Sequence, residues 1–229
     1  MKRVFLCTLL LLAVLSGKGQ ALPDALREQD ITQRQDFPQG REGFSSSFIN
    51  DSVRSLIVGK SYPYDCAIPL SDLRYLKVRY YDYQGYVRYG ELICNALIAD
   101  DLLDIFYRLF LSEYQIANIS LIDEYGADDN ESMEANNTSC FNYRKATNSS
   151  KLSLHARGLA IDINPVENPY IKNGVILPAN GKAYSDRSTH FSHKIDRDDL
   201  CYRLFKEKGF VWGGEWRTVK DYQHFEKQM

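Results

Sequence analysis

The sequence lacks several patterns that mark common classes of protein. It has only four histidines in 229 residues, and its five cysteines include no C-x-x-C pair, which argues against a zinc site built from cysteines. No cluster of Lys and Arg appears, and the formal net charge is −2, so a nucleic-acid partner, which usually needs a basic face, is not expected. The apolar run at residues 4–15 is too short to cross a bilayer comfortably.

The first 21 residues have the pattern of a secretory signal peptide. Lys2 and Arg3 precede the apolar run, and small and polar residues follow it up to Ala21, the expected cleavage site. Cleavage removes these two cations and Lys18 but no acid, so the mature chain is more acidic. We therefore expect export to the periplasm or the extracellular space, with no membrane attachment after cleavage. The alternative is a retained N-terminal anchor.

The mature chain keeps an even number of cysteines. In an exported protein an even number permits two disulfides, whereas four free buried thiols are the alternative. The sequence does not choose between them or among the possible pairings. The four residues are Cys66, Cys94, Cys140 and Cys201.

Residues 22–47 are rich in Gln, Arg, Gly and Ser with little apolar periodicity, which predicts a flexible lead-in. Residues 48–229 are predicted to form one domain. Because strands and helices mix without regular alternation, we expect the α+β class, with a small antiparallel sheet packed with helices. The predicted elements are a hairpin (75–83 and 86–93), helices at 96–114 (capped by Asn95) and 198–208, shorter strands at 119–123, 141–144, 159–163 and 209–212, and a loop at 126–137.

The stretch SLHARGLAID, residues 153–162, places an aspartate at the end of a buried-strand pattern. An ionised carboxylate in an apolar strand is costly unless it is paired or binds a metal. His155 precedes Asp162 by seven residues, which would put the two side chains on opposite faces of one regular strand. Gly158 permits a bend between them, so we expect the two side chains to converge.

A second group of polar residues lies in the stretch DYQHFE, residues 221–226. Asp221 is three residues before His224, so on a turn or a helical segment the two side chains lie on the same side. A carboxylate in that position is well placed to act on water at a metal. Glu226 is a competing base, because it alternates onto the face of His224 in an extended chain.

Together His155, Asp162 and His224 form a set of two histidines and one carboxylate. Catalytic zinc sites use three protein ligands and leave one position for water. The same set suits non-haem iron, but the residue types favour zinc. The remaining histidines, His190 and His193, lie in a polar stretch that predicts a loop, and we interpret them as non-ligands.

The residues and the order of these motifs resemble those of a known family. SLHARGLAID is similar to the Ser-x-His-x-x-Gly-x-Ala-x-Asp motif of the zinc D-Ala-D-Ala carboxypeptidase family, which includes D-Ala-D-Ala dipeptidases and L-alanyl-D-glutamate endopeptidases of phage and bacteria. The ending WGGEWRTVKDYQHFE resembles the second metal motif, especially that of the endopeptidase-like branch, and INPVENPY resembles one subgroup. The resemblance covers residues 141–226 well, and the two motifs in the right order and distance make it specific.

The resemblance implies a role for each residue that matches. His155, Asp162 and His224 correspond to the zinc ligands, and the metal site is expected in a surface cleft. Asp221 corresponds to the catalytic carboxylate, where many members have Glu and the endopeptidase-like branch has Asp. The shorter Asp must sit closer to the water or work through a different geometry.

Two further residues follow from the resemblance alone. Arg144 resembles the upstream arginine that stabilises the developing oxyanion, and its charged donors suit contact with substrate. Ser153 corresponds to a position near the substrate.

The implied activity is zinc-dependent hydrolysis of a peptide bond in a peptidoglycan stem peptide. The sequence leaves open whether the bond is that of a D-Ala-D-Ala carboxypeptidase or of an L-Ala-D-Glu endopeptidase, and it does not give the oligomeric state. The alternatives are a non-catalytic relative that binds cell-wall peptide, against which Asp221 and Arg144 argue, and a non-haem iron oxygenase, whose usual His-x-Asp spacing is absent.

Overall fold

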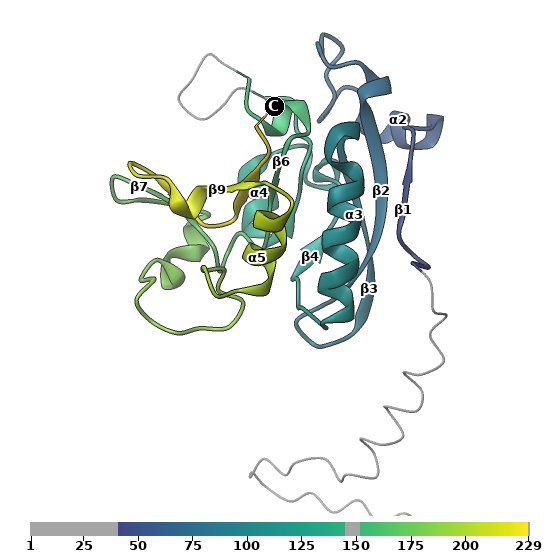
Figure 1. The fold of residues 1–229 in the computed structure, drawn as a ribbon. Coiled ribbons are helices and arrows are strands. Elements are labelled where there is room, and N and C mark those ends of the chain that lie inside the picture. The colour runs from purple at the N-terminus through teal and green to yellow at the C-terminus, as the bar shows by residue number, and fades with distance from the viewer. Residues whose placement is uncertain (1–40, 145–151, 229) are drawn as a thin grey trace, which may run out of the picture. The chain divides into compact units, whose positions relative to one another are not determined.

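The computed structural model describes residues 41–144 and 152–228, which form helices and small, mostly antiparallel sheets (Figure 1). The predicted α+β class is confirmed. The predicted signal peptide and most of the predicted lead-in, up to residue 40, lie outside the described residues. Within the described residues, no helix is both long and apolar enough to span a membrane.

The longest strands form the predicted hairpin. β2 (Leu73–Tyr81) pairs antiparallel with β3 (Val87–Asn95) over nine residues. The Asp82 carboxylate holds the turn, because it accepts hydrogen bonds from the backbone N–H groups of Gln84 (3.0 Å) and Tyr86 (2.9 Å). β1 (Ser45–Ser47), which lies at the end of the predicted lead-in, pairs with the other edge of β2.

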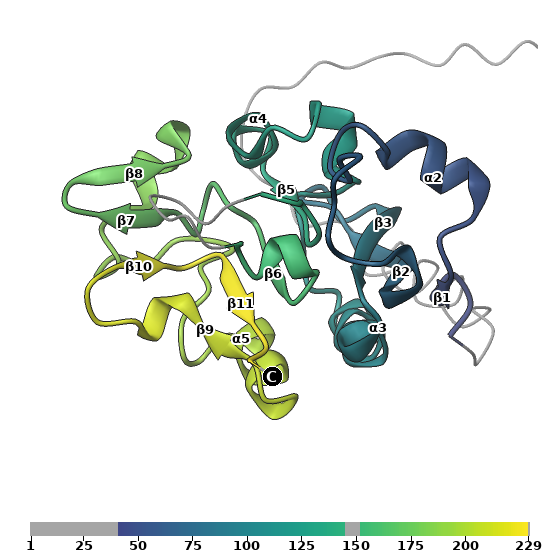
Figure 2. The same ribbon diagram turned by 90° about the horizontal axis from the view of Figure 1, so that it is seen from above.

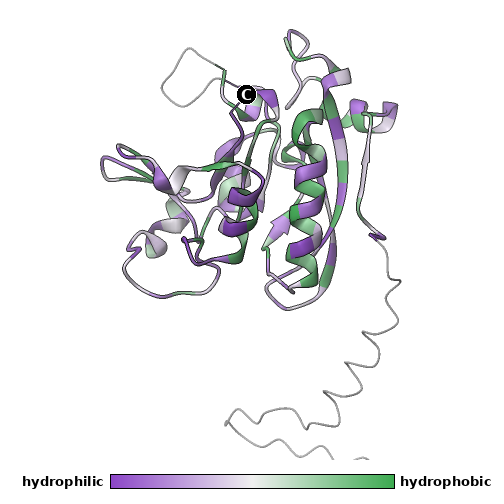
Figure 3. Cartoon of the chain, viewed as in Figure 1, coloured by the Kyte–Doolittle hydropathy of each residue, from purple (hydrophilic) through white to green (hydrophobic). Residues whose placement is uncertain are grey.

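α3 (Ala96–Leu111) packs against β2 and buries one face there. The Asn95 side chain caps the helix by accepting from the backbone N–H of Leu97 at 3.1 Å, as predicted. Figure 3 shows hydrophilic and hydrophobic residues alternating along α3. The helix ends three residues before its predicted end, and Glu113 beyond it has a φ of 52°, which a continuing right-handed helix does not permit.

The second half of the fold holds a three-stranded sheet in the order β6-β11-β9. Helix α5 packs against α3 and β9, and the Phe205 and Phe225 rings stack with centroids 4.2 Å apart. The helix predicted at 198–208 and the strands predicted at 159–163 and 209–212 are confirmed in shorter form. Their bounds are Ala160–Asp162 for β6, Leu200–Glu207 for α5, Val211–Trp212 for β9 and His224–Glu226 for β11.

A third small sheet has the order β10-β7-β8 and consists of β7 (Tyr170–Lys172), β8 (Val175–Leu177) and β10 (Lys220–Asp221). Asn173 and Gly174 connect β7 to β8 with φ values of 50° and 79°, the backbone of a tight two-residue hairpin. Figures 1 and 2 both place β7 at the opposite end of the domain from β1.

The remaining elements are short. A parallel two-stranded sheet joins β4 to β5, and short helices lie between the strands along the chain. Their bounds are Asp51–Ile57 for α2, Asn118–Ile119 for β4, Asp129–Glu134 for α4 and Asn137–Thr138 for β5, with 3-10 helices at Leu70–Asp72, Ile122–Tyr125, His155–Arg157, Ala179–Tyr184 and Gly213–Glu215.

The prediction of a strand at 141–144 is wrong. The backbone N–H groups of Phe141, Asn142 and Tyr143 donate to carbonyl oxygens in three different segments, at residues 93, 155 and 61. Because no single partner strand runs alongside, this segment forms no regular strand.

Two other predictions between the hairpin and residue 140 need correction. The strand predicted at 119–123 is β4 followed by a 3-10 helix, and the loop predicted at 126–137 contains α4. The α4 helix forms because the Asp128 side chain accepts hydrogen bonds from the backbone N–H groups of Asn130 (2.8 Å) and Glu131 (3.1 Å).

Of the two arrangements that the cysteine count permits, the structure has four free thiols. Three of them, Cys94, Cys140 and Cys201, are buried, and Cys66 is half-buried. Burial raises the pKa of each of these thiols, so they are protonated near neutral pH.

Gly158 provides the predicted bend before β6. Its φ of 66° ends the 3-10 helix that contains His155, and its carbonyl accepts a hydrogen bond from the backbone N–H of Asn95 at 2.8 Å. A Cβ atom at this position would lie 2.6 Å from that nitrogen and 3.0 Å from the carbonyl carbon of Cys94. The bend therefore requires glycine both for its backbone conformation and for the close approach of the hairpin.

We expect Gly158→Ala to destabilise the domain more than a substitution that changes φ alone. The matched control is Gly126→Ala, because Gly126 has a similar φ of 64° but a Cβ atom there would have no atom within 4 Å. Overpacking against the hairpin should add about 1–3 kcal/mol to the loss of unfolding free energy, measured by chemical denaturation. Equal losses in the two variants would contradict the close approach.

Candidate active site

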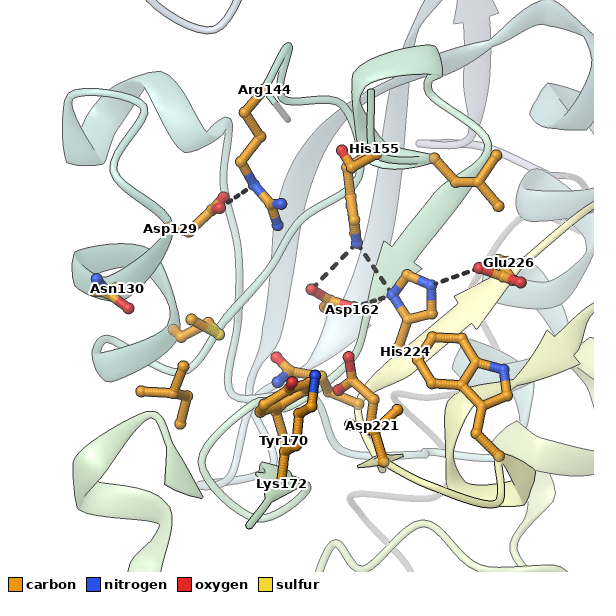
Figure 4. A pocket seen from close by; sticks show the side chains of 17 residues that line it. Asp129, Asn130, Arg144, His155, Asp162, Tyr170, Lys172, Asp221, His224 and Glu226 are labelled. Atoms are coloured by element: carbon orange, nitrogen blue, oxygen red, sulfur yellow. Dashed lines mark hydrogen bonds and ion pairs between the residues drawn. The ribbon is translucent and has the colours of Figure 1, made fainter. Parts of the chain in front are cut away.

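Three predicted ligands meet where β6 and β11 pair. Asp162 at the end of β6 lies directly opposite His224 at the start of β11, and His155 reaches them from the 3-10 helix before Gly158. One ligand atom from each side chain can be chosen so that all three lie within 4.8 Å of one another (Figure 4). Sequence spacing alone placed His155 beside Asp162, and the strand register adds His224.

His155 is buried, and a hydrogen bond on the side of the ring away from the other ligands orients it. Its Nδ1 lies 2.7 Å from the carbonyl oxygen of Cys140, so Nδ1 carries the proton and donates it there. Its Nε2 faces the other two ligands, 3.3 Å from Asp162 Oδ2 and 3.1 Å from His224 Nδ1. The hydrogen bond to Cys140 thus leaves the Nε2 lone pair for a metal.

Glu226 orients the His224 ring through a contact with the ring nitrogen that points away from the other ligands. Its Nε2 lies 3.1 Å from Glu226 Oε2, and its Nδ1 faces Asp162 Oδ1 at 3.0 Å. Glu226 does share a face of β11 with His224, but its contact is with the ring nitrogen that points away from the other ligands. The contact is that of a carboxylate that orients a metal-binding histidine.

Asp162 has neighbours on both sides of its strand. Its backbone pairs with β11 on one side and with Ser139 on the other, where the Asp162 N–H donates to the Ser139 carbonyl at 2.9 Å. Burial acts to raise the pKa of the Asp162 carboxyl, but His155 and His224 outweigh it and hold that pKa well below its usual value. The carboxyl is therefore ionised.

The surroundings of the His224 imidazole favour positive charge. Burial acts to lower the pKa of His224, but hydrogen bonds with Asp162 and Glu226 outweigh it and raise the pKa to about 10. The same histidine, in turn, lowers the pKa of Glu226 against the effect of burial. Carboxylates on both sides of the His224 ring thus stabilise a cation, whether a proton or a metal ion.

Asp221 lies on β10, the neighbouring sheet, rather than on a turn or helix with His224. Figure 4 shows its carboxylate pointing toward Asp162 and His224. Burial raises the pKa of Asp221 to about 7, with His224 opposing that rise and Asp162 adding to it. Its Oδ1 is buried and has no hydrogen-bond partner among the described residues.

A glycine that sequence reasoning did not single out makes room for Asp221. A Cβ atom on Gly213 would lie 2.6 Å from the Asp221 carbonyl oxygen and 2.8 Å from its Cβ. The sequence signal is the pair of glycines that follows Trp212. Any side chain at Gly213 would push the carboxylate out of its position.

Arg144 lies across the pocket from Asp221 and is paired with Asp129 of α4 (Figure 4). The other oxygen of Asp129 accepts from the Asn142 side chain at 2.8 Å. Asp129 therefore links α4 to the segment that ends in Arg144. The predicted loop at 126–137 gave no indication of this contact, because the role of Asp129 depends on the α4 helix.

Ser153 lines the same pocket, but its hydroxyl is used within the chain. The Ser153 oxygen accepts a hydrogen bond from the backbone N–H of Ala156 at 3.0 Å. Its backbone N–H donates to the Arg144 carbonyl at 3.1 Å. Ser153 thus ties the start of the His155 helix to the arginine segment.

The other two histidines lie away from the three ligands. His190 is exposed, and His193 stacks on Tyr83 with ring centroids 3.7 Å apart. Neither lines the pocket that holds the three ligands.

The ligands open into a pocket of about 510 Å³. Its walls come from α4, the 3-10 helix with His155, and the two small sheets. Two imidazoles with outward-facing lone pairs, one ionised carboxylate and the buried Asp221 oxygen fit a divalent metal ion and a water beside it. Of the described residues, only His155, Asp162 and His224 form such a group.

We expect the purified protein to bind one divalent metal ion per chain and to lose it when a ligand is removed. His155→Ala and His224→Ala should each bind less than about a tenth as much metal after dialysis, because three ligands are the minimum of such a site. His190→Ala is the matched control and should keep its metal. Elemental analysis of the folded proteins measures the content, and retention in both ligand variants would contradict the assignment.

Comparison with known families gives a match over the region that holds the site. Residues 147–227 match the sequence model of a family described as D-alanyl-D-alanine carboxypeptidase. Comparison with curated proteins and with solved structures gives no match. The matched region contains His155, Asp162, Asp221 and His224 and confirms the resemblance carried by the two motifs. This region of the chain is therefore similar to the D-alanyl-D-alanine carboxypeptidase family of peptidases.

Proposed function

We propose that the chain is a zinc-dependent peptidase that hydrolyses a peptide bond in peptidoglycan stem peptides. The observation that carries the proposal is the orientation of the two imidazoles. Each is held by a partner behind it, the Cys140 carbonyl for His155 and the Glu226 carboxylate for His224, so both free nitrogens face Asp162.

The donor set favours zinc. Two imidazoles and one carboxylate with an open fourth position are the ligands of many catalytic zinc sites. Zinc bound there would supply Lewis-acid chemistry, lowering the pKa of a water to about 7 and polarising the substrate carbonyl. Elemental analysis that found iron, with activity indifferent to zinc, would contradict this choice.

Asp221 is the proposed general base and acid. Its buried Oδ1 accepts a proton from the attacking water, and the same carboxyl returns the proton to the leaving amine. Its pKa of about 7 is close to the pH at which proton transfer in both directions is efficient. Glu226 is less suited to this role, because its carboxylate is engaged with His224 and with the Gln228 side chain at 3.1 Å.

Arg144 is the proposed partner of the developing oxyanion and of the substrate. It lies in the pocket wall and is oriented by Asp129, so its charge is held in place before substrate binds. Ser153 is proposed to act on the same wall by fixing the backbone on either side of it. A protein that only bound cell-wall peptide would need neither Asp221 nor a second positive group beside the metal.

The match to a family described as D-alanyl-D-alanine carboxypeptidase supports the proposed substrate class. Export, inferred from the pattern of residues 1–21, would bring the enzyme to the cell wall, where such peptides lie. The bond itself remains one of two, D-Ala-D-Ala or L-Ala-D-Glu.

Asp221→Asn should abolish hydrolysis while the metal stays bound. The amide keeps the size of the side chain but cannot accept the proton, so we expect turnover of a synthetic stem peptide to fall by at least about 10²-fold. Metal content and turnover are measured on the same sample.

Glu226→Gln is the matched control for that experiment. It should weaken metal binding by about 10–100-fold, because the histidine loses its orienting carboxylate, and activity should return with excess metal. Near-normal turnover in Asp221→Asn would move the base to Glu226.

Arg144→Ala should lower kcat/KM by about 10²–10³-fold without changing metal content, because the lost interaction is with the substrate and the oxyanion. Arg203→Ala, which removes an exposed arginine from α5, is the control and should leave kinetics unchanged. Unchanged kinetics in Arg144→Ala, measured with the same stem peptide, would make the arginine structural.

A further inference from the structure

Lys172 is a cation in the pocket wall that the proposed mechanism does not use. It is the last residue of β7, directly before the tight Asn173-Gly174 turn, and its side chain is half-buried. Figure 4 shows the side chains of Lys172 and Tyr170 extending from β7 toward Asp221 and Asp162. The ammonium group therefore lies on the substrate side of the sheet.

The strand register places Lys172 on the same face as the proposed base. Asp221 pairs with Tyr170, and Tyr170 pairs with Leu177, so the three form one row across the sheet, and all of them line the pocket. Lys172 follows Tyr170 by two residues, about 7 Å along the strand, and points to the same side. A substrate that reaches Asp221 thus passes close to the lysine.

Lys172 differs from other ionised side chains of the pocket in that they have protein partners. Arg144 is paired with Asp129, and the Asp162 and Glu226 carboxylates contact the imidazoles. The Lys172 side chain, by contrast, has no hydrogen bond or ion pair with any of the described residues. A lysine side chain in a pocket wall without a protein partner gains most from a ligand that brings an anion.

We propose that Lys172 determines specificity by binding a free carboxylate on the residue that leaves after cleavage. This inference rests on the proposed peptidase function and names the feature of the substrate that the pocket selects. The carboxylate docks on the β7 side of the pocket, and the scissile carbonyl then lies toward Asp221 and the three ligands.

Cleavage of either candidate bond releases a residue that carries a free carboxylate. Cleavage of a terminal D-Ala-D-Ala bond releases a residue that carries the terminal carboxylate. Cleavage of an L-Ala-D-Glu bond leaves D-Glu on the other fragment, and glutamate has two carboxyl groups but uses only one to continue the chain. Lys172 therefore selects for the chemistry that the two bonds share.

The first test measures binding without hydrolysis. The probes are an acylated D-Ala-D-Ala peptide with a free terminal carboxylate and the same peptide with a terminal carboxamide. The protein is the metal-loaded Asp221→Asn variant, so both probes stay intact during calorimetry. We expect the carboxylate peptide to bind about 10–100-fold more tightly, the range for a hydrogen bond between charged groups.

Substitutions at Lys172 assign that preference. In the Asp221→Asn background, Lys172→Met should bring the two affinities to within about threefold of each other, whereas Lys172→Arg should keep most of the preference. Lys182→Met is the matched control, because Lys182 is exposed on the neighbouring 3-10 helix and does not line the pocket. Equal affinities in the parent variant, failure of both peptides and of their L-Ala-D-Glu counterparts to bind, or a preference that survives Lys172→Met would overturn the proposal.

Hydrolysis of the same two peptides by the metal-loaded enzyme with Asp221 intact separates this inference from the proposed function. Cleavage of both peptides at equal kcat/KM overturns the role of Lys172 and leaves the peptidase function in place. Selective binding that depends on Lys172, without cleavage of either peptide or of its L-Ala-D-Glu counterparts, overturns the peptidase function and leaves the carboxylate site in place.

Discussion

The antiparallel pairing of β6 with β11 is the constraint on which the site depends. It sets Asp162 opposite His224, and a second pairing with Ser139 fixes the other edge of the same aspartate. Cys140, the residue after Ser139, supplies the carbonyl that orients His155. One short strand thus positions all three ligands, and a slip of one residue would turn the Asp162 side chain to the other face.

The proposed base depends on a different sheet, and the connection between the two sheets sets its distance from the ligands. Tyr222 and Gln223 form this connection between β10 and β11, and each of them is held by backbone contacts. The Tyr222 carbonyl accepts from the Trp212 indole at 2.9 Å, and the Gln223 carbonyl accepts from the Ile163 N–H at 3.0 Å. Asp221 and His224 therefore lie on strands of different sheets, and the fixed connection between these strands holds the two residues in one relative position.

Local patterns were sufficient to predict much of the fold. The hairpin, α3 with its Asn95 cap and the bend at Gly158 follow from alternation, capping and glycine conformation, which act within a few residues. The strand predicted at 141–144 failed because its hydrogen bonds go to three distant segments, which no local pattern reveals. For the same reason the sequence left Glu226 as a competing base, since only the observed contact of its carboxylate with His224 Nε2 shows it behind the ligand.

The central claim is that the three ligands and Asp221 form a peptidase site for the cell wall. Mass spectrometry of purified peptidoglycan fragments after incubation with the metal-loaded protein tests it most directly. The account predicts stem peptides shortened at one bond, with one water added across it, and no such products from the metal-free protein. Fragments that stay intact with the metal-loaded, folded protein would contradict it.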